Sequence, residues 1–166
     1  LLQGIGDGVQ PLISFYYGAK KEDKIHILYR KAFFVTIAVS LILCIAVVLF
    51  LNPLTALFGI SDAIFEGAKT AILITTVSFP FLGITRVTSA IFYATEKTRN
   101  STFLVYMEPC LLLPLSLFAL SFLFQLNGIW MAYPAAQLIL CGIALFMKNP
   151  LHAPAALPQT QEQTLC

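Results

Sequence analysis

The sequence predicts an all-α membrane protein, and three observations point to that class. Hydrophobic residues make up 58% of the 166 residues and charged residues only 11%, whereas soluble domains hold about a quarter charged residues. The mean hydropathy is +0.85. The apolar residues also gather in stretches long enough to cross a bilayer as helices, which satisfy their backbone amides internally.

Five apolar stretches approach or reach the roughly 20 residues that a helix needs to cross a hydrocarbon core. In chain order they cover residues 1–17, 33–52, 70–94, 101–124 and 127–147. The first stretch opens on Leu1 without an initiator Met or a basic leader, so we expect a C-terminal fragment of a longer protein. Residues 1–149 form the predicted membrane region, and the polar residues 150–166 are predicted to be a disordered cytoplasmic tail.

Basic residues in the connectors predict the orientation of these helices. One set of connectors holds most of them: Lys20, Lys21, Lys24, Arg30, Lys31, Lys97, Arg99 and Lys148. The alternate connectors hold only Asp62, Glu66 and Lys69. Because basic loops stay on the cytoplasmic side, we expect a multi-pass protein of the plasma or inner membrane, embedded in the lipid bilayer with its C-terminus in the cytoplasm.

Several classes of function lack support in the sequence. The net charge of +2 comes without the clustered basic face that nucleic-acid binding requires. The four cysteines show no CxxC or Cys/His spacing, so neither a metal site nor a disulfide framework is expected. No nucleophile, metal-ligand or phosphate-binding motif is present. We therefore expect no enzyme, no cofactor and no nucleic-acid partner.

Three charged residues fall inside the predicted membrane helices: Asp7, Arg86 and Glu108. Each costs about 2.5–3.5 kcal/mol at the helix centre on insertion scales, so each requires a partner or a function. Counted at about 1.5 Å per residue, they lie at similar depths, roughly 12–16 Å from the cytoplasmic side. Arg86 is predicted to meet Glu108. Two interpretations are open: the pair only neutralises two buried charges, or a carboxylate exchanges a proton or cation during transport.

A polar stripe follows one face of the first helix, with members three or four residues apart: Gln3, Asp7, Gln10, Ser14 and Tyr17. Such a stripe either forms hydrogen bonds between helices or lines a water-filled substrate path. Gln137 of the last helix can line the same cavity. The candidate transport-pathway residues are Asp7, Gln10, Ser14, Arg86, Glu108 and Gln137.

Prolines interrupt four of the predicted helices: Pro11, Pro80, Pro109, Pro114 and Pro134. Each removes a backbone hydrogen bond and favours a kink. Bent helices accompany binding sites and rocking motions in transporters. The prolines therefore favour a carrier over a simple anchor.

Three segments together resemble one family of transporters. These are GDGVQPLISFYYGAKKEDKIHILYRKAF (6–33), FPFLGITRVTSAIFYATEKTRNS (79–101) and LNGIWMAYPAAQLI (126–139). They resemble helices in the C-terminal lobe of multidrug and toxic compound extrusion (MATE) transporters, especially the bacterial multidrug efflux branch. The resemblance implies that residues 1–149 correspond to the eighth to twelfth helices of a twelve-helix carrier, within a six-helix C-terminal lobe.

The resemblance also implies a function and partners. Members export cationic or amphipathic small-molecule drugs in exchange for H⁺ or Na⁺, by alternating access between two lobes. The N-terminal lobe, absent here, would be a partner of these helices. Some members use carboxylates in the tenth helix, where this sequence has Arg86 instead. An alternative is a flippase for lipid-linked oligosaccharides or lipids in the same superfamily, which would be expected to line its cavity with several cations.

Overall fold

The computed structural model describes residues 1–57 and 62–148, and these residues contain helices and turns but no strand. The predicted tail at 150–166 lies outside the described residues. In chain order the elements are α1 (Leu2–Gly18), α2 (Glu22–Leu49), α3 (Leu51–Leu57), α4 (Asp62–Thr76), α5 (Phe79–Ala94), α6 (Thr98–Met107), the π-helix η1 (Glu108–Leu112) and α7 (Leu113–Lys148). The predicted all-α membrane fold is confirmed.

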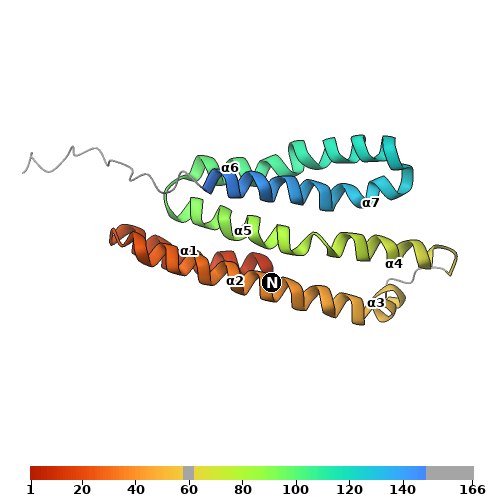
Figure 1. Ribbon diagram of the computed structural model, residues 1–166, viewed down its shortest axis with the longest axis horizontal. Helices are drawn as coiled ribbons and strands as arrows, with labels where there is room; N and C mark the ends of the chain where they lie inside the picture. Colours follow the sequence, from red (N-terminus) through yellow and green to blue (C-terminus); the bar gives the residue numbers. More distant parts are fainter. Residues whose placement is uncertain (58–61, 149–166) are drawn as a thin grey trace, which may run out of the picture.

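The helices form three layers, with α4 and α5 in the middle (Figure 1). On one side lie α1 and α2, and on the other lie α6, η1 and α7. Helix α5 packs against α1, α2, α6 and α7. One apolar cluster, which includes Ile13 and Val87, joins α5 to α1 and α2. A second, which includes Phe92 and Leu140, joins α5 to α6, η1 and α7.

Three helical segments are long and apolar enough to cross a membrane: Glu22–Leu49, Phe65–Ala94 and Thr98–Met147. The last contains two of the predicted passes, because the chain reverses within α7 (Figure 1). The reversal is at Gln125, whose φ of 52° and ψ of −127° are not helical. Helix α1 has 17 residues, which gives about 25 Å of helix and falls short of a full crossing.

The boundary between the first two helices differs from the prediction. The basic segment up to Lys31 was expected to be a connector, but α2 already begins at Glu22 and the turn is confined to residues 19–21. The prediction was wrong because hydropathy reports which residues favour lipid, whereas a helix can extend beyond the bilayer. Glu22 and Asp23 lie in the first turn of α2, where acidic side chains favour a helix N-terminus.

The predicted third pass is divided at residues 77–78, between α4 and α5. Pro80 lies in the first turn of α5 and has no N–H to donate to the carbonyl oxygen of Thr76 four residues earlier. The thiol of Cys44, from α2, donates to that oxygen over 3.4 Å. The Ser78 hydroxyl donates to the carbonyl oxygen of Thr75 over 2.6 Å. The carbonyl oxygen of Thr75 also accepts from the backbone N–H of Ser78, so the Cys44 thiol is the side chain that replaces the donor missing at Pro80.

The other prolines lie in different helical surroundings. Pro109 lies within η1, where the N–H of Leu113 bonds to the carbonyl oxygen of Glu108 five residues earlier. Pro114 follows directly in α7, whereas Pro11 and Pro134 lie inside α1 and α7. Since Pro11 lacks an N–H, it leaves the backbone carbonyl of Asp7 without its helical donor.

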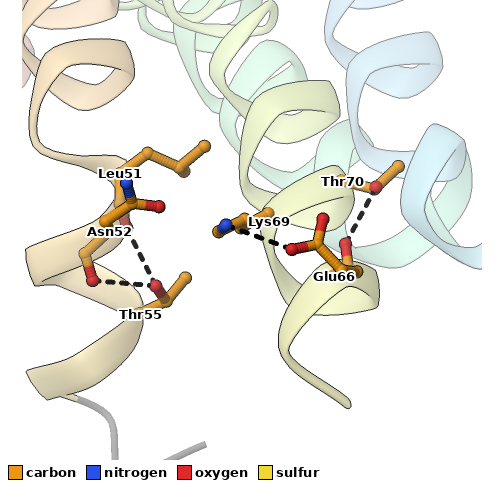
Figure 2. A network of polar contacts seen from close by, with 6 residues as sticks. All are labelled: Leu51, Asn52, Thr55, Glu66, Lys69 and Thr70. Atoms are coloured by element: carbon orange, nitrogen blue, oxygen red, sulfur yellow. Dashed lines mark hydrogen bonds and ion pairs between the residues drawn. The ribbon is translucent and has the colours of Figure 1, made fainter. Parts of the chain in front are cut away.

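Near the connection between α3 and α4, the hydrogen bonds and the ion pair that Figure 2 shows stay within each helix. Lys69 pairs with Glu66 over 3.2 Å, and the Thr70 hydroxyl donates to the carbonyl oxygen of Glu66. The Thr55 hydroxyl donates within α3. The Glu66 side chain is 85% exposed. An exposed pair of this kind contributes little to stability, which makes Glu66 a useful reference carboxylate below.

Candidate functional site

An open cavity of about 310 Å³ lies where α1, α5 and α6 meet. Its lining residues recur three or four positions apart on each helix, as expected for side chains on one helical face. They are Gln3, Asp7 and Gln10 from α1, Arg86, Ser89, Ala90 and Tyr93 from α5, and Ser101 and Val105 from α6. The cavity is therefore lined by a carboxylate, a guanidinium and several neutral polar groups.

Close packing of α1 on α5 brings the polar stripe to this cavity. A Cβ atom added to Gly6 would lie 3.3 Å from the backbone carbonyl oxygen of Arg86, so the absent side chain permits this approach. Near the other end of α1, the Ser14 hydroxyl donates to the carbonyl oxygen of Ala94 over 3.5 Å. On the far wall, the hydroxyls of Ser89 and Ser101 share a hydrogen bond of 2.9 Å that links α5 to α6.

Behind the cavity, Glu108 at the start of η1 accepts hydrogen bonds on both of its oxygens. Arg86 Nη2 lies 3.4 Å from Glu108 Oε2. Gln137 Nε2, from the second arm of α7, donates to Glu108 Oε1 over 2.6 Å. The Glu108 side chain is 11% exposed and Gln137 is fully buried. The charge of Glu108 is thus offset by Arg86 inside the helical bundle.

Arg86 connects the residues that line the cavity to the buried pair of Glu108 and Gln137. Its side chain is 29% exposed and lines the cavity, while one end of its guanidinium pairs with the buried Glu108. A change in the charge of Glu108 therefore changes the electrostatic potential at the cavity wall, since charges separated by a few ångströms interact strongly away from water.

The structure brings five of the six predicted pathway residues into this region. Asp7, Gln10 and Arg86 line the cavity, and the predicted contact between Arg86 and Glu108 is present. Gln137 bonds to Glu108 rather than lining the cavity.

Ser14 and Tyr17 of the predicted stripe do not line the cavity. Ser89 and Ser101 line the cavity but were not among the predicted residues. Ser89 could have been predicted, because it follows Arg86 by three residues and so lies on the same helical face. No comparable signal identified Ser101, because its contact depends on how α6 returns along α5.

An open polar cavity beside a buried ion pair is typical of membrane transport proteins, and α5 and α6 belong to segments long enough to cross a membrane. The family model MatE matches residues 1–117. The chain therefore belongs to the MatE family of membrane transporters. No curated protein and no solved structure matches the chain. The matched region includes Asp7, Arg86 and Glu108 and ends before Gln137.

Proposed function

We propose that the chain is part of a secondary active multidrug exporter in the plasma or inner membrane. The exporter exchanges an amphipathic or cationic drug for H⁺ or Na⁺ by alternating access. The observation that carries this proposal is the position of Arg86, which lines the open cavity and pairs with the buried Glu108. An exchanger needs such a connection between a substrate site and an ionisable group, because occupancy of one must alter the affinity of the other.

The cavity walls described here come from three helices of one lobe. We propose that an N-terminal lobe of the same protein completes the site, and that the two lobes move against each other. Bent helices favour such movement. The turn before α5 and the π-helix after α6 interrupt the helical segments at two points along the chain, one before and one after these two cavity helices.

A flippase for lipid-linked oligosaccharides is less well supported. Recognition of a diphosphate group favours several basic side chains around the site. Among the residues that line the cavity, Arg86 is the only cation, and Glu108 already pairs with it.

The first prediction tests the role of Glu108 in the full-length carrier, reconstituted into liposomes with an imposed pH or Na⁺ gradient. Glu108→Gln removes the ionisable group but keeps an oxygen and a nitrogen near Arg86 and Gln137. We expect gradient-driven export of a cationic dye to fall by about tenfold or more, the scale of a lost coupling energy. The exposed Glu66→Gln is the matched control and should leave export unchanged.

Comparison of the two gradients identifies the coupling ion. If Glu108→Gln loses export under only one of the two gradients, Glu108 binds the ion of that gradient. If Glu108→Gln exports dye at the wild-type rate under both gradients, with the same dependence on pH, Glu108 serves only as the partner of Arg86.

A further inference from the structure

Helix α2 is longer than the hydrocarbon core of a bilayer, and its charged residues all lie at one end. Its 28 residues span about 42 Å, whereas the hydrocarbon core is about 30 Å thick. The charged residues of α2 fall within residues 22–31, and residues 32–49 contain none. The apolar part of α2 therefore covers most of the core, and residues 22–31 reach the level of the lipid headgroups.

One side of this charged end faces away from the other helices. Lys24, Ile27 and Lys31 recur three and four residues apart, which places them on one helical face, and all three are exposed. Arg30 is exposed beside them and lies over the ring of Phe34, 5.9 Å from its centroid. The buried residues of α2 lie on its opposite face, toward α1 and α5. We call Lys24, Arg30 and Lys31 the α2 basic face.

The α2 basic face continues into an exposed apolar surface of the same helix. Phe34, Leu41 and Ile45 follow on this side, and each is at least half exposed. A molecule bound here meets cations at the level of the headgroups and apolar side chains along the core. The headgroup phosphate and the acyl chains of a phospholipid lie in the same order along the membrane normal.

Two acids lie on the same end of α2, and both are distant from the cations nearest the core. Glu22 and Asp23 are in the first turn of α2, about 10 Å or more along the helix axis from Arg30 and Lys31. Salt screens exposed charges over such a distance. Among residues 1–57 and 62–148, no carboxylate forms an ion pair with the α2 basic face. Arg30 and Lys31 therefore keep their charges available to an anion.

The other ionisable groups near this end of the bundle do not reverse that balance. Glu96 follows α5, which contacts the buried face of α2, and Lys97 comes directly after it. Lys20 and Lys21 of the preceding turn are further cations, and His26 adds positive charge when it is protonated. The surface is therefore net positive.

We propose that the α2 basic face binds an anionic phospholipid, with the headgroup phosphate at Arg30 and Lys31 and the acyl chains along Phe34 and the apolar residues that follow it. A guanidinium and an ammonium both donate hydrogen bonds to phosphate oxygens. A zwitterionic lipid also carries a cation, which these side chains repel, so the charge favours a lipid such as phosphatidylglycerol. Binding at this surface needs neither the cavity nor the proposed export.

The test uses a tryptophan at position 34 as a local reporter of lipid binding. The full-length carrier carries Phe34→Trp, with its other tryptophans replaced by phenylalanine, in phosphatidylcholine vesicles. Lipids with brominated acyl chains quench a nearby tryptophan, so quenching compares the affinities of brominated phosphatidylglycerol and brominated phosphatidylcholine at this surface. We expect a preference of about tenfold or more for phosphatidylglycerol, because each cation near an anionic surface contributes about fivefold.

Variants of the reporter protein test the assigned cations. Arg30→Gln/Lys31→Gln should lower the preference by about tenfold or more, whereas the charge-preserving Arg30→Lys/Lys31→Arg should keep most of it. Lys69→Gln is the matched control, because it removes a cation from α4, and it should leave the preference unchanged. Thermal unfolding in phosphatidylcholine vesicles verifies the fold. If the double variant unfolds, the single variants Arg30→Gln and Lys31→Gln should each lower the preference by about fivefold.

Three results would overturn the proposal. The first is a reporter protein without a preference, or a preference that survives both glutamine substitutions. The second is an equal loss in Lys69→Gln, because the preference would then reflect the net charge of the carrier. The third is displacement of the brominated phosphatidylglycerol by soluble glycerol 3-phosphate, because the surface would then bind phosphate groups without their acyl chains.

Discussion

Glu108 illustrates how a membrane protein holds a single carboxylate in its interior. An unpaired charge at this depth costs about 2.5–3.5 kcal/mol on insertion scales. Arg86 supplies the opposite charge and Gln137 a short hydrogen bond, so both carboxylate oxygens have a donor. Gln137 Oε1 is buried and has no hydrogen-bond partner among the residues that the structure describes. That oxygen carries a desolvation cost of about 1–3 kcal/mol, which the bond to Glu108 helps to offset.

The contact between Arg86 and Glu108 could be predicted because charges in lipid require partners and the two helices follow each other with a short connector. The contact of Gln137 could not. Gln137 lies 29 residues after Glu108, and its position depends on the angle at which α7 returns after Gln125. That angle is set by side-chain packing between the two arms, which a hydropathy pattern does not report.

The second prediction concerns Gly83 in α5. A Cβ atom at this position would collide with Cγ2 of Thr36 in α2 and lie 3.4 Å from the side chain of Leu2. Thr36 is fully buried and its β-branched side chain has few alternative rotamers. Gly83→Ala should therefore lower the free energy of unfolding by about 1–3 kcal/mol, as overpacking does. Thermal unfolding of the full-length carrier in micelles measures the change.

Gly142 provides the matched control, because a Cβ atom there would meet no atom of residues 1–57 or 62–148 within 4 Å. Gly142→Ala lies inside α7 and should stabilise the helix slightly, by up to about 1 kcal/mol. Equal melting temperatures for Gly83→Ala and the wild type would show that α2 and α5 are not in close contact at Thr36.

At the scale of elements, the break between α4 and α5 follows from its residues. Pro80 releases the carbonyl of Thr76, and the thiol of Cys44 on the neighbouring α2 takes the place of the missing N–H. The sequence identified Pro80 as an interruption. It did not identify Cys44 as the donor, because that assignment requires the register of α2 against α4, and many registers present an equally apolar surface.

The third prediction tests whether the Cys44 thiol replaces the N–H that Pro80 lacks. Cys44→Ala should destabilise the carrier by about 1 kcal/mol, the net value of a typical hydrogen bond. Cys44→Ser keeps a donor and should have a smaller effect. In the background of Pro80→Ala, an N–H is available to Thr76, so Cys44→Ala should lose most of its effect. Thermal unfolding of the four combinations forms a double-mutant cycle.

A coupling energy near zero in this cycle would contradict the account, because Cys44 and Pro80 would then act independently. Hydropathy predicted one helix at 70–94, whereas the structure has a turn at residues 77–78, directly before Pro80. Hydropathy does not report this turn, because the residues around it are as apolar as those of a continuous helix.

At the scale of the whole molecule, the turns divide between two ends of the bundle. The turns at residues 19–21 and 95–97 lie at one end, and the reversal within α7 lies at the other (Figure 1). This alternation was predictable from the number and length of the apolar stretches. The central position of α5 could not be predicted, because apolar helices of similar composition can pack in several orders.

The fourth prediction concerns orientation. In a carrier whose native cysteines are replaced by serine, a membrane-impermeant maleimide added to intact cells should label Gln125→Cys but not Lys20→Cys or Lys97→Cys. We expect this result because basic residues lie near the last two positions, and basic loops favour the cytoplasmic side. Permeabilised cells, in which all three should react, provide the control. Labelling of Lys20→Cys and Lys97→Cys alone would reverse the proposed topology.

The packing of α1 against α5 has a consequence for biosynthesis. The hydrogen bond from Ser14 reaches an acceptor 80 residues further along the chain. At about 5–20 residues per second, a ribosome needs roughly 4–16 s to make the intervening chain. During that interval α1 lacks the surface of α5 on which Gly6 and Ile13 pack. We therefore expect α1 to complete its packing only after α5 has entered the bilayer.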